Sequence, residues 1–364
     1  MVRILVPALV FLSLLARPGT GADNEEPTFR DKKASEWLAM LQKDPSARHR
    51  RAALIALGIL GPKVPGSVAG VSAALLKDSD EEVRREAAQT LGQMGAEAKE
   101  ALPALADACQ HDKADSVREA AVTSLGRWGP AAKPAVPVLA LALKDSHPGT
   151  RAAAAEALGQ LGADAGVALP NLVAALQDPD RFVRSYAAHT LGRLGSEARV
   201  AVPALATAAR QDTQADVRRA AVETLGRLGP EAAAAIPSLG KALSDPQPEV
   251  RRAAAFALAQ LGPNVREVLP SLQAALKDRD RSVRSLAIHA IAGLGAAARP
   301  AIPDLALCLQ DDAVEVRQDA ALELGNLGPQ AKEAIPALQA ALQDSRVVVR
   351  EAAAEALKKI QAAP

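Results

Sequence analysis

The chain has 364 residues, of which 49% are hydrophobic and only 2% aromatic, and its 43 basic and 42 acidic residues leave a net charge of +1. This balance gives no general attraction to nucleic acid or an anionic membrane, and the hydrophobic content excludes a disordered chain. A globular core of this size normally contains more large rings, whereas alanine and leucine, both good helix formers, dominate here. The composition therefore indicates a helical chain with little β-structure.

The N-terminus has the layout of a secretory signal peptide. Arg3 precedes an uncharged apolar run at 4–16, and the small residues Thr20 and Ala22 are placed for cleavage before Asp23. The run is too short to span a bilayer comfortably, and no cysteine follows it for lipid attachment. We expect residues 1–22 to be a signal peptide, residues 23–32 a polar linker, and the mature protein to be exported, periplasmic or secreted, without a membrane span.

The remaining chain, residues 33–361, repeats with a period of 33–34 residues. An arginine, usually preceded by valine, recurs ten times at this spacing, and an aspartate stands six residues before each one. The arginines are Arg50, Arg84, Arg118, Arg151, Arg184, Arg218, Arg251, Arg284, Arg317 and Arg350. The aspartates are Asp44, Asp78, Asp112, Asp145, Asp178, Asp212, Asp245, Asp278, Asp311 and Asp344.

Each repeat predicts two short helices. A proline, usually nineteen residues after the arginine, suits the first turn of the first helix, where its missing N–H costs nothing. The second helix has apolar residues at positions −1, +3, +7 and +10 from its arginine, within about 80° of arc, and glycine follows. Asp80, Asp180 and Asp280 are placed to cap second helices. Because one pair cannot bury its apolar stripes alone, ten stacked pairs are needed for a continuous core.

These features resemble the HEAT repeat, in particular the short bacterial HEAT-like form that phycobilin lyases also have. The resemblance is carried by the Asp–Arg pair, the second-helix pattern "AA…LG…G" and the first helix that begins at proline. It implies an all-α fold, a right-handed α-solenoid of about ten two-helix repeats, with first helices on the convex side and second helices on the concave side. It also implies a ladder of aspartate and arginine side chains within and between units.

We interpret the ladder residues as structural. A guanidinium can hold a carboxylate and a loop carbonyl with several donors in one fixed plane, and an acid–base pair present in every unit is a poor candidate for a single active site. The central members of the ladder are Asp178, Arg184, Asp212, Arg218, Asp245, Arg251, Asp278 and Arg284.

Other positions are assigned by their place in the repeat. Cys109 lies in the third unit and Cys308 in the ninth, too far apart for a disulfide, so both are expected to be small core residues. Trp128 stands at +10, where other units have leucine, and is also expected in the core. Lys358 replaces the small residue found at +8 elsewhere and is expected to form a polar end cap.

A binding surface is expected on the face of the second helices opposite the buried stripe, at positions +1, +5 and +9. In units five to eight this face and its border are unusually rich in rings and arginine for so ring-poor a chain. We define these residues as the central patch: Tyr186, His189, Arg193, Arg219, Arg227, Arg252, Phe256 and His289. The hypothesis is that the central patch binds a protein segment of acidic character. The alternative is a solvated face with incidental aromatic residues.

Enzymatic classes have weaker support. HEAT-like deoxyhypusine hydroxylase binds iron through His-Glu pairs, but no histidine here is followed by glutamate, and His189 and His289 are three units apart. The sequence has no phosphate-binding glycine loop and no convincing nucleophile–base set, so we predict no catalytic residues, no metal and no cofactor. HEAT-like DNA glycosylases use a basic channel, but net charge and export argue against nucleic acid. The sequence therefore predicts an exported, non-enzymatic protein-binding scaffold; the alternative is an enzyme or enzyme subunit of the HEAT-like lyase type.

Overall fold

Ten pairs of helices follow one another along the chain in the computed structural model, which describes residues 26–362. The first helices of the pairs are α1 (Ala34–Lys43), α3 (Ser67–Lys77), α5 (Leu102–His111), α7 (Val136–Ala142), α9 (Leu169–Ala175), α11 (Val202–Gln211), α13 (Ile236–Ala242), α15 (Leu269–Ala275), α17 (Ile302–Leu307) and α19 (Ile335–Ala341). The second helices are α2 (Ala47–Leu60), α4 (Glu81–Met94), α6 (Asp115–Arg127), α8 (Pro148–Leu161), α10 (Arg181–Arg193), α12 (Ala215–Leu228), α14 (Pro248–Leu261), α16 (Arg281–Ala292), α18 (Val314–Asn326) and α20 (Val347–Gln361).

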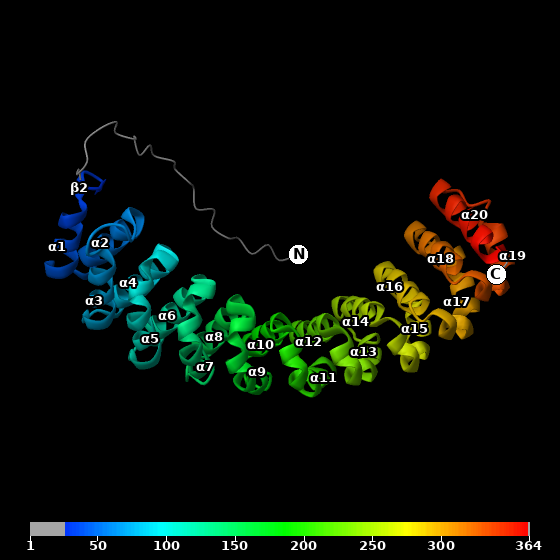
Figure 1. Ribbon diagram of the computed structural model, residues 1–364, viewed down its shortest axis with the longest axis horizontal. Coiled ribbons are helices and arrows are strands. Elements are labelled where there is room, and N and C mark those ends of the chain that lie inside the picture. The colour runs from blue at the N-terminus through cyan, green and yellow to red at the C-terminus, as the bar shows by residue number, and fades with distance from the viewer. Residues whose placement is uncertain (1–25, 363–364) are drawn as a thin grey trace.

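The pairs stack into an open arc (Figure 1). The even-numbered second helices line its inner, concave side, and the odd-numbered first helices form the outer side. Each second helix packs against the second helices of the neighbouring units, as α10 does against α8 and α12. The predicted all-α solenoid is thereby confirmed.

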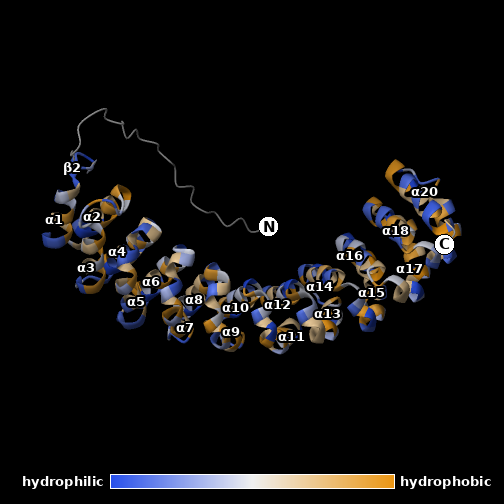
Figure 2. Ribbon diagram, in the orientation of Figure 1, coloured by the Kyte–Doolittle hydropathy of each residue, from blue (hydrophilic) through white to orange (hydrophobic). Residues whose placement is uncertain are grey.

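The core is a continuous layer between the two rows of helices. In α12 the predicted stripe of Val217, Ala221, Leu225 and Leu228 is buried, with exposed fractions of 0% for the first three residues and 6% for the last. Figure 2 shows apolar and polar residues on every helix, as expected for elements that bury one face and leave the other in water. Alanine and leucine supply most of this core.

Eight of the nine links between units contain a 3₁₀ turn that the sequence pattern did not predict, and a further one, at Cys308–Gln310, follows α17 within the ninth unit. After most second helices a glycine with positive φ, such as Gly229 at +57°, opens a 3₁₀ turn that leads into the next first helix. The 3₁₀ segments are η1 (Gly95–Ala101), η2 (Gly129–Ala135), η3 (Gly162–Ala168), η4 (Gly195–Ala201), η5 (Gly229–Ala235), η6 (Gly262–Val268), η7 (Gly295–Ala301), η8 (Cys308–Gln310) and η9 (Gly328–Ala334). Glycine adopts this left-handed conformation without the steric cost that a Cβ brings.

The predicted helix starts are confirmed. Proline occupies the first turn of the first helices from α5 onward. The Asp80 carboxylate accepts hydrogen bonds from the backbone N–H groups of Glu82 and Val83 at 3.0 and 3.1 Å. Asp180 and Asp280 cap α10 and α16 in the same way.

The N-terminal end differs from the predicted linker. The expected signal peptide, 1–22, lies outside the described residues. Part of the segment 23–32 forms a short antiparallel hairpin of β1 (Thr28–Phe29) and β2 (Lys32–Lys33). The indole N–H of Trp37 donates to the backbone carbonyl of Phe29 at 3.1 Å, so the hairpin is tied to α1.

The remaining positional predictions are also confirmed. Cys109 and Cys308 are unbridged and buried, and burial raises the pKa of their thiols to about 12 and about 11. Trp128 is buried and donates from its indole N–H to the carbonyl of Leu91 at 3.1 Å. Lys358 is exposed on the last helix. Within residues 26–362, no helix combines the length and hydrophobicity that crossing a membrane requires.

Candidate functional site

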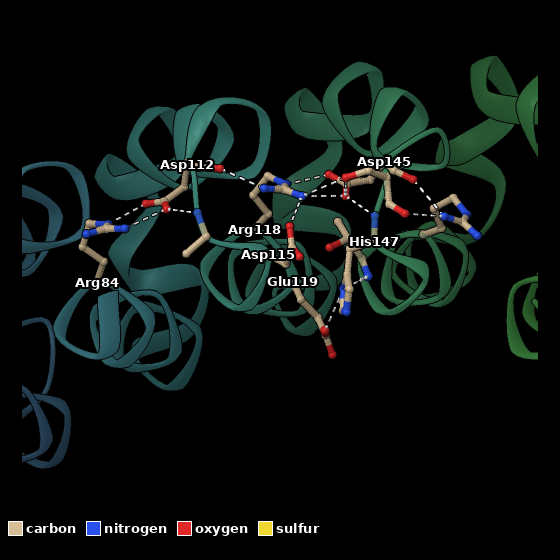
Figure 3. A network of polar contacts seen from close by, with 11 residues as sticks. Arg84, Asp112, Asp115, Arg118, Glu119, Asp145 and His147 are labelled. Carbon is tan, nitrogen blue, oxygen red and sulfur yellow. Dashed lines mark hydrogen bonds and ion pairs between the residues drawn. The ribbon is translucent and has the colours of Figure 1, made fainter. Parts of the chain in front are cut away.

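The repeated arginines connect each unit to the next. Arg84 donates from Nε and Nη2 to the two carboxylate oxygens of Asp112, in the following unit, at 2.7 and 3.0 Å. Its Nη1 donates to the backbone carbonyl of Asp78, in its own unit, at 3.0 Å. Figure 3 shows this arrangement, with Asp112 and Arg118 continuing it toward Asp145.

The same contact occurs at all nine junctions between the ten units. The nine ion pairs are Arg50–Asp78, Arg84–Asp112, Arg118–Asp145, Arg151–Asp178, Arg184–Asp212, Arg218–Asp245, Arg251–Asp278, Arg284–Asp311 and Arg317–Asp344. Burial opposes ionisation of Asp145, but hydrogen bonds from Arg118 and from the backbone N–H of His147 outweigh it and hold its pKa below the ordinary value. We call this series the ladder; its bidentate pairs are largely buried and join each unit to the next.

The central patch of the sequence analysis divides into three groups. The first group, Tyr186, His189 and Arg193, lies on α10. Arg193 donates from Nη1 to the carbonyl of Gly159 at 3.1 Å and so links α10 to α8. Burial lowers the pKa of His189 and raises the pKa of Tyr186. These residues contribute to the concave surface but do not line a common cavity.

The second group surrounds a hollow on the concave side, which we call the central hollow. Its volume is about 750 Å³ and it spans α12, α14 and the start of α16. Three residues of the central patch line it: Arg227, Arg252 and Phe256. The other lining residues are Glu223, Gly226, Glu249, Ala253, Gln260 and Leu286. Phe256 is 54% exposed, about as much as Phe182 on α10 at 50%, but it lies in this hollow.

The charges around the central hollow are partly paired. Arg219, the remaining residue of the central patch, is not among the lining residues but donates to one of them, Glu223, at 2.7 Å. Arg252 donates to Glu249 at 3.3 Å. The surface is therefore less basic than its arginines alone suggest.

The third group is His289, which faces the next unit and not the hollow. Its Nδ1 lies 2.9 Å from a carboxylate oxygen of Glu323, and its Nε2 lies 3.6 Å from one of Asp319. The Ser285 hydroxyl also donates to Asp319. Hydrogen bonds with Asp319 and Glu323 raise the pKa of His289 to about 10, so the imidazolium is charged at neutral pH. We call Ser285, His289, Asp319 and Glu323 the junction cluster.

Sequence reasoning missed Leu286 and the two carboxylates of the junction cluster because it compared columns +1, +5 and +9 and took only Tyr186 from column +2. Leu286 and Asp319 stand at +2, where six units have alanine, and Glu323 stands at +6, where the other units have alanine, serine or threonine. A comparison of these two columns would have identified all three residues. Among residues 26–362, no group of three or more His, Cys, Asp or Glu side chains is arranged to hold a metal ion.

The family model described as HEAT repeats matches six overlapping segments: 34–126, 110–169, 135–226, 202–292, 236–325 and 302–364. The chain belongs to the HEAT-repeat family. Its HEAT units are the helix pairs described above, and the ladder joins each unit to the next. No curated protein sequence matches the chain at a significant level.

Solved structures share the solenoid architecture. An engineered protein is similar with a TM-score of 0.62 and 23% identity over 92% of this chain and 100% of its own. Kap95p, solved with RanGDP, has a TM-score of 0.60 and 15% identity over 90% of this chain. Importin beta has a TM-score of 0.57 and 17% identity, also over 90% of this chain. The chain spans about half the length of these two, 49% and 51%. At these identities the likeness concerns the HEAT fold alone.

Proposed function

We propose that this HEAT-repeat chain is an exported, non-enzymatic scaffold whose concave face binds a protein partner through the central hollow. The observation that carries the proposal is the half-exposed Phe256 in a hollow of about 750 Å³. Interfaces concentrate their binding energy in a few aromatic and arginine residues at the centre of a concave or flat surface. Kap95p, which shares the solenoid architecture, binds RanGDP, and this supports protein binding as a use of such a fold.

The non-enzymatic part of the proposal is supported by the ion pairs that the charged side chains of the ladder and the junction cluster form with one another. The ladder engages its arginines and aspartates in pairs between units, and the junction cluster pairs His289 with two carboxylates. Among the described residues, neither place has a histidine nitrogen hydrogen-bonded to a hydroxyl or thiol, the arrangement by which a histidine activates serine or cysteine. A chromophore or stoichiometric metal in the purified protein would contradict this part and favour a lyase-type activity.

The binding surface is tested by capturing partners with two variants of the chain in crosslinking experiments on envelope and secreted fractions. The first variant changes Arg227, Phe256 and Gln260 to alanine, all on the central hollow. The matched control changes Arg127, Gln89 and Gln93, which occupy the +9, +5 and +9 columns of the second and third units. We expect a partner that the wild type and the control capture and the hollow variant loses. Equal capture by all three proteins would place the binding surface elsewhere.

Export is tested separately by sequencing the N-terminus of the mature protein from its native host. The expected first residue is Asp23. A mature protein that retains residues 1–22 would contradict the export mechanism but leave the binding proposal in place.

A further inference from the structure

The central hollow has an apolar floor that suits one large side chain of a partner. Phe256 and Leu286 stand on neighbouring helices, α14 and α16, and Ala253 and Gly226 complete the apolar lining. Leu286 replaces the alanine that most units have at the same position, so the hollow has more apolar surface here than at other junctions. Pockets of this size usually combine such a lining with a small number of polar groups that fix orientation.

Both arginines of the hollow have donors available for a ligand, and Arg227 is the less paired of the two. Arg252 lies close to two carboxylates, Glu249 at 3.3 Å and Asp280 at 3.7 Å. Arg227 differs: its nearest carboxylate, Glu223, is 4.0 Å away and already accepts a hydrogen bond from Arg219. Among the described residues the guanidinium of Arg227 donates no hydrogen bond, and the side chain is 51% exposed.

We propose that the central hollow binds an extended partner segment by inserting one large apolar side chain between Phe256 and Leu286 and pairing a carboxylate of the same segment with Arg227. The inference rests on the proposed function and adds the chemistry of the partner. A guanidinium favours carboxylates because it offers paired donors in one plane. A basic segment fits less well, because Glu223 and Glu249 are already paired with arginines of this chain.

The geometry of the solenoid also sets the spacing within the segment. Packed helices lie about 8–10 Å apart, and an extended chain advances about 3.3 Å per residue, so one helix spacing corresponds to about three residues. Arg227 projects from α12, whereas Phe256 and Leu286 come from α14 and α16. A side chain inserted between α14 and α16 lies about one and a half helix spacings from α12, so the carboxylate is expected about four residues from it, on the side toward α12.

The test is selection of random twelve-residue peptides displayed on phage against the full chain. The recovered peptides are expected to share a large apolar residue with Asp or Glu about four positions away. The most enriched peptide is then synthesised with a fluorophore and titrated by anisotropy. We expect Phe256→Ala to weaken its binding about tenfold or more, as at a typical hot spot. Arg227→Gln should weaken it similarly and abolish the preference for Asp or Glu over Asn or Gln in the peptide.

The matched controls are Arg127→Gln and Gln89→Ala on the same face of the second and third units, which should leave the affinity unchanged. Because Phe256 and Arg227 are half exposed, their variants are expected to keep the wild-type helix content, measured by circular dichroism. The inference would be overturned if the recovered peptides lacked a carboxylate or had basic residues in its place. It would also be overturned if their binding were insensitive to Phe256→Ala, or if no peptide were recovered. If the captured partner still depends on the hollow in that case, the proposed function stands and only the partner chemistry is wrong.

Discussion

Each arginine of the ladder acts in two units at once, because its guanidinium spans the junction between them. Arg218 donates to both oxygens of Asp245 at 2.6 and 2.9 Å, and to the carbonyl of Asp212 at 2.9 Å. This explains why the arginine is retained in every repeat while its neighbours vary. Lysine could not replace it, because one ammonium group cannot make the planar, two-pronged contact.

Removal of a ladder arginine is expected to destabilise the solenoid. Arg218→Ala leaves Asp245 buried without its partner, and such a loss costs about 3–5 kcal/mol at fully buried sites. Since the side chain of Arg218 is 13% exposed and that of Asp245 7%, we expect about 3 kcal/mol in the free energy of unfolding. Urea denaturation followed by circular dichroism measures the change.

The last unit supplies a matched control for this prediction. Arg350 makes only the carbonyl contacts, to Asp344 and Ser345, and among the described residues it has no carboxylate partner. Arg350→Ala should therefore cost much less than Arg218→Ala. Equal losses would show that the carbonyl contacts, and not the ion pairs, stabilise the junctions.

The junction cluster predicts a pH dependence of stability at units eight and nine. The pKa of His289 is raised to about 10 in the folded chain, above the ordinary value of about 6.5 for an unfolded histidine. Its contribution is thus complete below pH 6.5 and is lost as the pH rises toward 10. The side chain is 40% exposed, so solvent screening limits the contribution to about 1 kcal/mol.

This dependence is measured by comparing the melting temperatures of the wild type and His289→Gln between pH 6 and 10.5. The wild type should be more stable at pH 6, and the difference should decrease steadily above pH 7. His189→Gln is the control, because among the described residues His189 has no hydrogen bond to a carboxylate and burial lowers its pKa. A difference for His289→Gln that stays constant with pH would exclude the ionic contact as its cause.

At the scale of the helices, small residues at position +8 set how closely consecutive second helices pack. An ideal Cβ on Gly126 of α6 would lie 2.8 Å from the Cβ and 3.0 Å from the Cα of Ala157 on α8. Gly226 and Gly325 meet alanines of the next unit in the same way. Because the obstacle includes backbone atoms, it can be relieved only by moving the helix.

Gly126→Ala is therefore expected to destabilise the chain by about 1–3 kcal/mol, despite the better helix propensity of alanine. Gly58→Ala is the matched control in the first unit. Its new Cβ would meet only side-chain atoms, Gln93 Oε1 at 3.2 Å and Thr90 Cγ2 at 3.3 Å, which can shift. The control should be neutral or slightly stabilising, because alanine favours a helix by up to about 1 kcal/mol over glycine. Chemical denaturation of both variants measures the change in the free energy of unfolding. A change of the same sign for both variants would contradict the close-packing argument.

At the scale of the whole molecule, the arc is built by repeating one local contact. Each unit packs mainly against its neighbours, so stability accumulates along the chain and not through contacts between distant segments. The concave surface can therefore vary at its exposed positions without loss of the fold. This is why the central hollow and the junction cluster can depart from the common pattern within the same scaffold.

The sequence by itself determined the fold, since the 33–34-residue period, the apolar stripe, the glycine stops and the Asp–Arg pairs are all local or strictly periodic. It also placed Arg227, Arg252 and Phe256 on the concave face. Only the tertiary structure decided which side chains lie together. Phe256 and Leu286 share a hollow, and His289 pairs with carboxylates of the next unit. The structure also shows that the guanidinium of Arg227 has donors available. The physical reason is that such contacts join residues about one repeat apart, 34 residues for His289 and Glu323. The rotation between units, set by packing along the whole stack, decides whether two such side chains touch.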